Sequence, residues 1–448
     1  MTPSRYYLLS LGCAKNTVDA QGMAQLLERD GYVGVGDPEQ ADVLIVNTCG
    51  FIDLARQESS DALRELAQSK RPDQVLIAAG CLAQFWGTRL ETESPGLDGV
   101  IGTRRWMDIV EVVERVRESR RAEPLYHLPD DALNVGKDER GTLRAAIQGA
   151  SAYLKIADGC RRPCAFCSIP LIKGTAVSRP PETILAQTRR LADAGMRELI
   201  IIAQDSSDYG HDLGMQDGLA WLLEQIVAKS PEIDWVRLMY AYPGYVTPRL
   251  IEVMAEHGQI LPYLDIPLQH AHPDVLRRMR RPASVDKVRR TIAALRQAMP
   301  GIAIRTTFIA GYPGETEKEF QTLLDFVAEA AFDRVGVFAY SHEPGTPSAS
   351  LPDPVPEEVK AERRERLMAL QQGISLDKNQ TFVGQSLDAL IEGQGDGLSI
   401  GRSYRDAPEI DGLVLIDGDA PLGEIVPVRI TGALEYDLSG SLDAGLTS

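Results

Sequence analysis

The chain has 448 residues, of which 44% are hydrophobic and 25% charged, and its formal net charge is −17. This size and balance are those of an ordinary globular protein of two or three domains. Six cysteines in so long a chain exclude a secreted disulfide scaffold and indicate metal or redox chemistry in a reducing compartment. The negative charge disfavours nucleic acid as a partner, because phosphate contacts dominate that affinity, and it favours basic partners.

The residues before Cys13 resemble the start of a lipoprotein signal. Their apolar run, "YYLLSLG", is only about seven residues long and has polar breaks, so a strand is the better interpretation. No segment approaches the ~20 apolar residues of a membrane span. We therefore expect a cytoplasmic protein without a membrane partner.

The N-terminal part of the chain alternates apolar runs with polar segments of helical periodicity. This strand–helix alternation predicts a parallel sheet covered on both faces, which is an open doubly wound domain. A charged helix and a polar, proline-containing linker follow, so we place this domain with its linker at residues 1–140. The predicted strands are 6–12, 41–48, 74–80 and 98–102.

A second series of apolar runs, separated by helical patterns, begins near residue 150. Six strand–helix units predict a full or partial (β/α) barrel with functional residues at the C-terminal ends of its strands. We place this domain at residues 141–378, with a charged helix over 357–372. The predicted strands are 152–160, 198–205, 235–243, 263–270, 303–314 and 334–341.

Short alternating runs divided by glycine and aspartate make up the last part of the chain. This pattern predicts a small, five-stranded antiparallel β-barrel over residues 379–448. The predicted strands are 386–393, 398–405, 412–417, 424–430 and 433–438.

Three cysteines, Cys160, Cys164 and Cys167, fall in one loop after the first predicted barrel strand. Thiolates this close can ligate one metal centre. A structural zinc ion would need a fourth local ligand, and the nearest following histidine is His211. A four-iron cluster held by three cysteines leaves one iron free to bind another molecule. Chance cysteines or a loop disulfide are the alternative.

The other three cysteines, Cys13, Cys49 and Cys81, each follow a predicted strand of the N-terminal sheet. The carboxyl ends of parallel strands share one edge, where ligands bind in such folds. The three thiols should therefore converge, again without a fourth cysteine. Buried structural cysteines are the alternative. We expect two open-sided iron–sulfur clusters, one in each of the first two domains.

Motifs along the whole chain resemble those of the radical S-adenosylmethionine methylthiotransferases. The C-x3-C-x2-C spacing, with Phe166 before the last cysteine, matches the cluster loop of radical S-adenosylmethionine enzymes, and the N-terminal trio is similar to that of methylthiotransferases. The C-terminal barrel resembles the family's TRAM domain. Further matching segments are "LGCAKNTVDA" (11–20), "VNTCGF" (46–51), "CAFCSIP" (164–170), "SRPPE" (178–182), "AQDSSDYG" (203–210), "LQH" (268–270), "RTTFIAGYPGETEKEF" (305–320) and "FAYSHEPGTPS" (338–348).

The resemblance implies two [4Fe-4S] clusters and S-adenosyl-L-methionine as cofactors. The cluster at Cys160, Cys164 and Cys167 would cleave S-adenosylmethionine to a 5′-deoxyadenosyl radical, which abstracts hydrogen from an unactivated C–H bond. The cluster of the N-terminal trio would hold a sulfur that a second S-adenosylmethionine methylates. A flavodoxin- or ferredoxin-like reductant would supply electrons.

The resemblance also implies cofactor contacts outside the cysteines, at Phe166, Gln204, Asp205 and Arg305. A loop phenylalanine can also be a simple plug, and a polar strand end can look like Gln204 and Asp205 without binding anything. Arg305 can pair with the cofactor carboxylate as a bidentate fork. His270, at a strand end, has a supporting or a direct role. Lys173 stands where relatives are expected to carry arginine, which keeps the positive charge but loses the planar fork of the guanidinium.

The substrate is predicted from the last domain. Residues 381–448 contain three basic and twelve acidic residues, a local charge of −9, which would repel RNA and attract a basic ribosomal protein. The segment "GRSYRDAPEIDG" (401–412) resembles the branch that methylthiolates the β-carbon of an aspartate in ribosomal protein S-twelve; as bare composition it is a polar hairpin turn. We expect the target loop to add to an exposed barrel strand.

Three other functions compete with this one. The nearest is a tRNA adenosine methylthiotransferase, although the acidic balance predicts weak or absent nucleic-acid binding. An iron–sulfur electron-transfer or scaffold protein would need neither a barrel nor an open iron. A non-catalytic protein-binding module would leave six cysteines placed for ligation unexplained.

Overall fold

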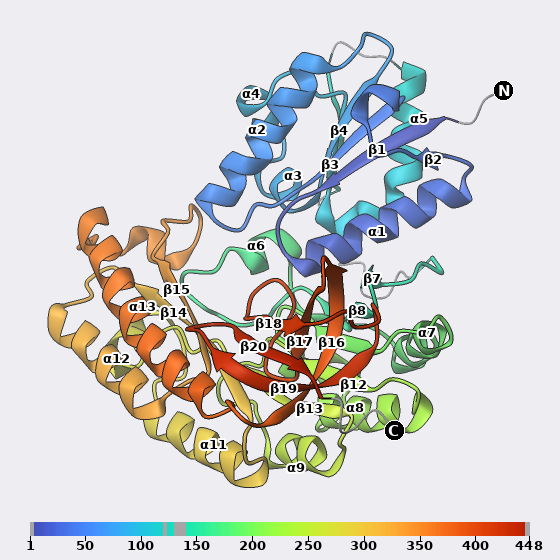
Figure 1. Cartoon of the computed structure of the whole chain (residues 1–448). Coiled ribbons are helices and arrows are strands. Elements are labelled where there is room, and N and C mark those ends of the chain that lie inside the picture. Colours follow the sequence, from blue (N-terminus) through green and yellow to red (C-terminus); the bar gives the residue numbers. More distant parts are fainter. Residues whose placement is uncertain (1–3, 120–122, 130–139, 444–448) are drawn as a thin grey trace.

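The computed structural model describes residues 4–119, 123–129 and 140–443. Its three main sheets follow one another along the chain: an open parallel sheet, a larger curved sheet and a small closed barrel (Figure 1). The C-terminal barrel lies against the middle domain, and the N-terminal domain lies across both. Among the described residues, none of the helices combines the length and the apolar character needed to cross a membrane.

The N-terminal domain is built on a six-stranded, wholly parallel sheet in the order β2-β1-β3-β4-β5-β6. Helices α1 and α5 bury their apolar sides on one face, and α2 and α3 on the other. The prediction of an open doubly wound sheet is confirmed. The elements are β1 (Arg5–Ser10), α1 (Ala14–Arg29), β2 (Val33–Gly34), β3 (Val43–Thr48), α2 (Asp53–Ser69), β4 (Val75–Ala79), α3 (Gly80–Trp86), α4 (Arg89–Glu93), β5 (Gly99–Gly102), α5 (Ile109–Ser119) and β6 (Leu125–His127).

The stretch predicted to be a polar linker differs from that expectation. Its residues Leu125–His127 form β6, which pairs with β5 and extends the parallel sheet. Three residues are too few to show a strand period, so the local pattern carries no signal. The linker residues 120–122 and 130–139 lie outside the described residues.

The middle domain is a partial barrel. Its sheet runs β15-β14-β13-β12-β11-β8-β7, in which six strands are parallel and β7 is antiparallel to β8. Helices pack on the outer face of this sheet around one large apolar core. The elements are β7 (Ala145–Gln148), β8 (Ser151–Lys155), β9 (Ala157–Asp158), α6 (Ile169–Lys173), β10 (Val177–Ser178), α7 (Pro181–Asp193), β11 (Glu198–Ile202), α8 (Gly218–Lys229), β12 (Trp235–Leu238), α9 (Pro248–Glu256), β13 (Ile260–Asp265), α10 (Pro273–Arg278), α11 (Val285–Ala298), β14 (Ala303–Ala310), α12 (Glu317–Ala330), β15 (Arg334–Ala339) and α13 (Glu357–Gln380).

The inner face of this partial barrel is filled from both neighbouring domains. Val18 of α1 and Ala407 of the C-terminal domain join the buried cluster formed by inward-facing residues such as Tyr153 and Tyr263. An open barrel would otherwise expose this apolar surface, so the flanking domains stabilise the middle one by covering it.

The C-terminal domain is a closed five-stranded barrel in the order β16-β17-β18-β20-β19. Four pairings are antiparallel and the fifth, between β18 and β20, is parallel. The run 433–438 was predicted as the last strand, but Leu434 to Asp437 form a turn closed by the Leu434 N–H to Asp437 C=O bond, and the strand begins at Leu438. The strands are β16 (Ser386–Gly395), β17 (Leu398–Ser403), β18 (Val414–Asp417), β19 (Ile425–Ala433) and β20 (Leu438–Leu442).

Candidate metal centres

The N-terminal cysteines converge at one edge of their sheet, as predicted. Cys13 caps α1, Cys49 directly follows β3, and Cys81 is the second residue of α3, after β4. The side chain of Asn16 ties these loops together. Its amide nitrogen donates to the Leu11 carbonyl at 2.7 Å, and its amide oxygen lies 4.0 Å from the sulfur of Cys81.

Gly12 lets the first two of these loops approach closely. A Cβ on Gly12 would lie 2.7 Å from the Cβ and 2.8 Å from the Sγ of Cys49, and the residue has a φ of +90°. An L side chain would therefore meet both a clash and an unfavourable backbone conformation. Glycine at position 12 is thus required by the close approach of this loop to Cys49.

Electrostatics distinguish Cys13 from its two partners. Burial raises the pKa of Cys49 to about 12, and burial also raises the pKa of Cys81. At Cys13, the same desolvation is outweighed by the charges of Lys15 and Lys173 and by backbone N–H bonds, so its pKa is lowered. A metal that binds all three must displace protons from the buried thiols.

The second trio lies on the loop between β9 and α6. Cys164 is held by two side chains from other loops: Arg281 donates to its sulfur from 3.4 Å, and the hydroxyl of Tyr242 lies 3.9 Å away. Burial raises the pKa of Cys160 to about 11 and that of Cys167 to about 12. All six cysteines are free thiols, so the loop-disulfide alternative does not hold in this structure.

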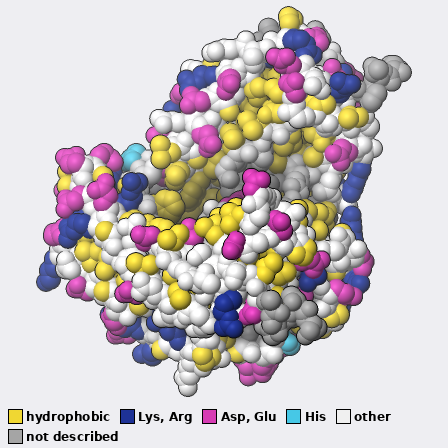
Figure 2. All heavy atoms as spheres, viewed as in Figure 1, with side chains coloured by type: hydrophobic (Ala, Val, Ile, Leu, Met, Phe, Trp, Pro, Cys, Tyr) yellow, Lys and Arg dark blue, Asp and Glu magenta, His cyan; other side chains and the backbone are white. Residues whose placement is uncertain are grey.

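The loops that carry the two trios meet at the domain interface. Ser168, next to Cys167, donates to the carbonyl of Phe51, two residues after Cys49, at 3.4 Å. Figure 2 shows that the molecule is hollowed between the N-terminal domain and the parts below it, with hydrophobic side chains along the hollow. The geometry therefore gathers both sets of thiols on one interdomain space.

Two arginines of the cysteine loop anchor it to the segment after β11. Arg161 donates to both carboxylate oxygens of Asp208, at 2.6 and 2.5 Å. Arg162 donates to Asp205 at 2.5 Å and lies over the ring of Tyr245, 3.7 Å from its centroid. The structure thus gives Asp205, a predicted cofactor contact, an ion-pair partner inside the protein.

The other predicted contacts have different surroundings. Gln204 has a buried side-chain oxygen with no hydrogen-bond partner among the described residues, so it can accept a bond from a ligand. Phe166 packs with Tyr312 and Tyr340 in a small apolar cluster. The guanidinium of Arg305 lies 3.1 Å from Asp265 and 3.4 Å from Asp411. Its role as partner of the cofactor carboxylate stays a prediction, and it would require a change of partners.

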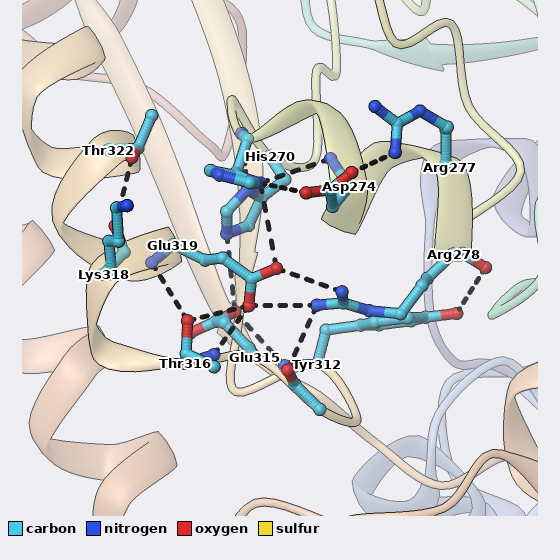
Figure 3. A network of polar contacts seen from close by, with 12 residues as sticks. His270, Asp274, Arg277, Arg278, Tyr312, Glu315, Thr316, Lys318, Glu319 and Thr322 are labelled. Carbon is cyan, nitrogen blue, oxygen red and sulfur yellow. Dashed lines mark hydrogen bonds and ion pairs between the residues drawn. The ribbon is translucent and has the colours of Figure 1, made fainter.

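The loops at His270 and Glu315 form a buried polar network (Figure 3). His270 accepts from the His272 N–H at 2.9 Å, and its Nε2 lies 3.5 Å from Glu315. Near them, His272, Asp274 and Glu319 are close enough to hold a small cation. However, arginines already pair with both of these carboxylates, Arg278 contacting Glu319 at 3.0 Å, so this group holds the loops together.

Sequence reasoning missed Lys15, Asp19 and Lys155, whose charged side chains meet where α1 contacts the middle domain, and it named Lys173 without its partner. Lys15 places its ammonium 3.3 Å from the ring centroid of Tyr240 in the middle domain. Asp19 accepts from Lys155 and Lys173 at 2.5 and 2.8 Å. Lys15 and Asp19 lie within the matching segment 11–20, but only the three-dimensional structure shows their partners.

The donor set fits iron–sulfur clusters. Six thiols in two groups of three are soft ligands suited to iron–sulfur centres, and each group lies next to positively charged side chains that favour the anionic form. Gln204, next in the chain to Asp205, which pairs with Arg162 of the cysteine loop, supplies an unused buried acceptor. The residues present therefore fit two clusters and a small polar cofactor.

Known proteins resemble this chain over its whole length. Three family models match: the Radical SAM superfamily over residues 154–327, the uncharacterized protein family UPF0004 over 5–102 and the TRAM domain over 383–442. The ribosomal protein uS12 methylthiotransferase RimO of Roseiflexus sp. (strain RS-1) is 50% identical, with 98% of this chain and 97% of that protein covered. The protein of the same name from Chloroflexus aurantiacus is 49% identical, with 97% and 99% covered.

A solved structure shares the fold. The radical S-adenosylmethionine methyltransferase TsrM from Kitasatospora setae matches with a TM-score of 0.56 at 14% identity, covering 89% of this chain and 80% of that one. At this identity the likeness concerns the arrangement of the elements alone.

Proposed function

The chain belongs to the ribosomal protein uS12 methylthiotransferase family of radical S-adenosylmethionine enzymes, and from this premise we propose that it adds a methylthio group to the β-carbon of an aspartate of uS12. The observation that carries the proposal is the contact, at one domain interface, between the loops that carry the two cysteine trios. Sulfur insertion needs one centre to activate a C–H bond and a second to hold the sulfur, and this chain offers a ligand set for each.

The cysteines would hold the two centres. Cys160, Cys164 and Cys167 would ligate the [4Fe-4S] cluster of radical chemistry, and Cys13, Cys49 and Cys81 a second one. When bound with S-adenosylmethionine, the first cluster supplies a carbon radical able to take hydrogen from an unactivated C–H bond. Arg281 and Tyr242 orient Cys164, and both arginines of the loop fix its position through Asp205 and Asp208.

Two further residues, Gln204 and Phe166, are assigned to the cofactor site. We assign the unused oxygen of Gln204 to accept a hydrogen bond from S-adenosylmethionine. Phe166 would shape the wall of the same site. The interdomain space would exclude water during turnover, because a radical is quenched by stray hydrogen donors.

The surface of the C-terminal barrel supports a basic protein partner. Of its three arginines, Arg402 and Arg405 are buried and lie within ion-pair distance of acidic side chains, which leaves Arg429 exposed. Acidic side chains therefore far outnumber the one arginine on the exposed surface of this barrel, which would attract a lysine- and arginine-rich protein and repel tRNA. The exposed acidic residues are Asp388, Glu392, Asp396, Glu409, Asp417, Asp419, Glu424 and Glu435.

The target loop would approach along the outermost strand of the middle sheet. β15 is an edge strand, and Phe338 near its end is 53% exposed. A groove of about 820 Å³ lies beside this end, between Leu54 and Trp86 of the N-terminal domain and Tyr340. An extended peptide that adds to such an edge reaches the interdomain space.

We assign three functional units. Residues 1–140 would hold the N-terminal cluster, residues 141–378 would carry out the radical chemistry, and residues 379–448 would bind the substrate. The enzyme would act in the cytoplasm, where a flavodoxin- or ferredoxin-like protein would reduce its clusters.

Iron and sulfide quantification on anaerobically purified protein tests the proposal. Cys13→Ala and Cys160→Ala should each lose one cluster and keep the other, and neither variant should methylthiolate uS12 in a mass-spectrometric assay. A wild-type protein that binds a single cluster, or that modifies tRNA and leaves uS12 unchanged, would contradict it.

A further inference from the structure

Five charged side chains are buried where α1 meets the middle domain. One of them is Arg144, which lies 2.5 Å from Asp158 and 3.4 Å from Asp19. Asp19 of α1 lies 2.5 Å from Lys155 and 2.8 Å from Lys173, and Asp158 lies 2.6 Å from Lys155. Each of these side chains is at most 5% exposed. We call this group the interdomain charge cluster. Burying charges is unfavourable unless they are paired, so its members fix the docking of the two domains.

Lys173 connects this cluster to both cysteine trios. α1 begins directly after Cys13, and α6 follows Cys167 and ends at Lys173. The ion pair between Lys173 and Asp19 therefore joins the helix that starts at one trio to the helix that starts at the other. In Figure 1, α6 lies between the N-terminal domain and the barrels.

Two lysines, one from each domain, act on the N-terminal trio. Lys15 and Lys173 are both close enough to Cys13 to influence its thiol electrostatically, and Lys173 acts on Cys81 as well. The two ammonium groups also repel one another. Like charges gathered away from water are unfavourable unless an anion lies between them, and a metal centre bound by three thiolates is anionic.

We propose that Lys173 is an electrostatic counterpart, supplied by the middle domain, of the metal centre at Cys13, Cys49 and Cys81, and that it raises the reduction potential of that centre. The inference rests on the proposed function, in which these cysteines hold an iron–sulfur cluster. Reduction adds negative charge, so a nearby buried cation stabilises the reduced form. Asp19 acts in the opposite sense, because its carboxylate neutralises part of this field. The reduction potential of the centre is therefore raised by Lys173 only when the two domains are docked.

The test measures reduction potentials in the full chain. A parent with Cys160, Cys164 and Cys167 all changed to alanine holds the N-terminal centre alone, and its potential is followed by electron paramagnetic resonance during a reductive titration. Lys173→Gln should lower the potential and Asp19→Asn should raise it, each by a tenfold change in the reduction equilibrium, which is about 59 mV for one electron. Lys173→Arg keeps the charge and should keep the potential.

Lys70→Gln is the matched control. Lys70 also pairs with one aspartate, Asp98, but it follows α2 and precedes β4, at the opposite edge of the same sheet. Its loss should leave the potential unchanged.

The direction of the shifts separates this inference from a purely structural role. A looser domain interface would shift the reduction potentials of Lys173→Gln and Asp19→Asn in the same direction. Either that result or two unchanged potentials would overturn the proposal. If Lys173→Gln does not fold, Asp19→Asn compared with Asp19→Glu decides alone. A parent that contains no iron contradicts the proposed function itself.

Discussion

Arg402 of the C-terminal barrel donates to Glu198 at the start of β11, with 2.6 Å between its Nη2 and the carboxylate Oε2. The other oxygen of Glu198 accepts from Arg237 at 2.7 Å, and all three side chains are buried. One carboxylate thus binds an arginine of its own sheet and an arginine of the next domain. The C-terminal barrel is therefore attached to the middle domain through the carboxylate of Glu198. Loss of this carboxylate would leave both arginines buried without it.

Glu198→Gln should destabilise the protein by about 3–5 kcal/mol, because removal of one partner leaves buried charges unpaired. The free energy of unfolding is measured by urea titration, with tryptophan fluorescence as the probe. Glu232→Gln makes the same change in an exposed pair with Arg189 and should have little effect. Equal effects of the two variants would show that the interdomain pair does not hold the barrel.

The same carboxylate predicts a pH dependence. Burial opposes its ionisation, but Arg402 and Arg237 outweigh burial and lower the pKa of Glu198 from 4.5 to about 2. A depressed folded-state pKa stabilises the protein above the unfolded-state pKa, and this contribution is lost as the pH falls from about 4.5 to about 2. Urea titrations at decreasing pH should show a steeper loss of stability for the wild type than for Glu198→Gln across this window.

The sequence predicted what depends on local order along the chain. Strand–helix alternation placed Cys13, Cys49 and Cys81 at one sheet edge, because parallel strands bring their carboxyl ends together whatever lies between them. It could not find β6, because a strand of three residues shows no periodicity. It also misplaced the start of β20, because the turn closed by Leu434 and Asp437 sets where that strand begins.

Pairings across domains were beyond sequence reasoning. Arg402 and Arg405 were counted as surface charges of the last domain, whereas both are buried. Arg305 was expected to face a cofactor, and it contacts Asp411 from the segment 401–412. That segment was interpreted as a mark of the substrate branch, and in the structure much of it is buried against the barrel. Nothing in a local pattern shows which distant residue covers a charge.

Gly12→Ala should remove the N-terminal cluster and leave the other in place. The added methyl group would meet Cys49, and the backbone φ of +90° adds strain. Gly31→Ala is a matched control, because Gly31 has the same φ and no described atom lies within 4 Å of the position that its methyl group would take. Iron per chain should fall by about half in the first variant and stay unchanged in the second. Equal losses would mean that backbone strain alone, and no contact with Cys49, explains the effect.

Arg281→Met should make the second cluster more labile. Arg281 donates to the sulfur of Cys164, and loss of such a supporting bond typically costs 10–100-fold in metal affinity. The rate of iron release to a chelator under anaerobic conditions measures this, in the background of Cys13→Ala so that one cluster is observed. Arg277→Met, at an exposed arginine on α10, should release iron at the wild-type rate. An unchanged rate in Arg281→Met would remove this arginine from the site.

Reversal of two acidic charges on the C-terminal barrel should weaken binding of uS12. Asp417 and Asp419 are exposed near the end of β18, and each surface charge contributes about 0.2–1 kcal/mol to an attraction. The double change to lysine should therefore raise the Kd on the order of tenfold at low salt, and the difference should vanish near 1 M salt, where the Debye length is about 3 Å. Titration calorimetry with isolated uS12 measures both. The same reversal at Glu114 and Glu118, exposed on α5, should leave the Kd unchanged. A loss of affinity that persists at high salt would mean that shape, and no long-range attraction, is what this surface recognises.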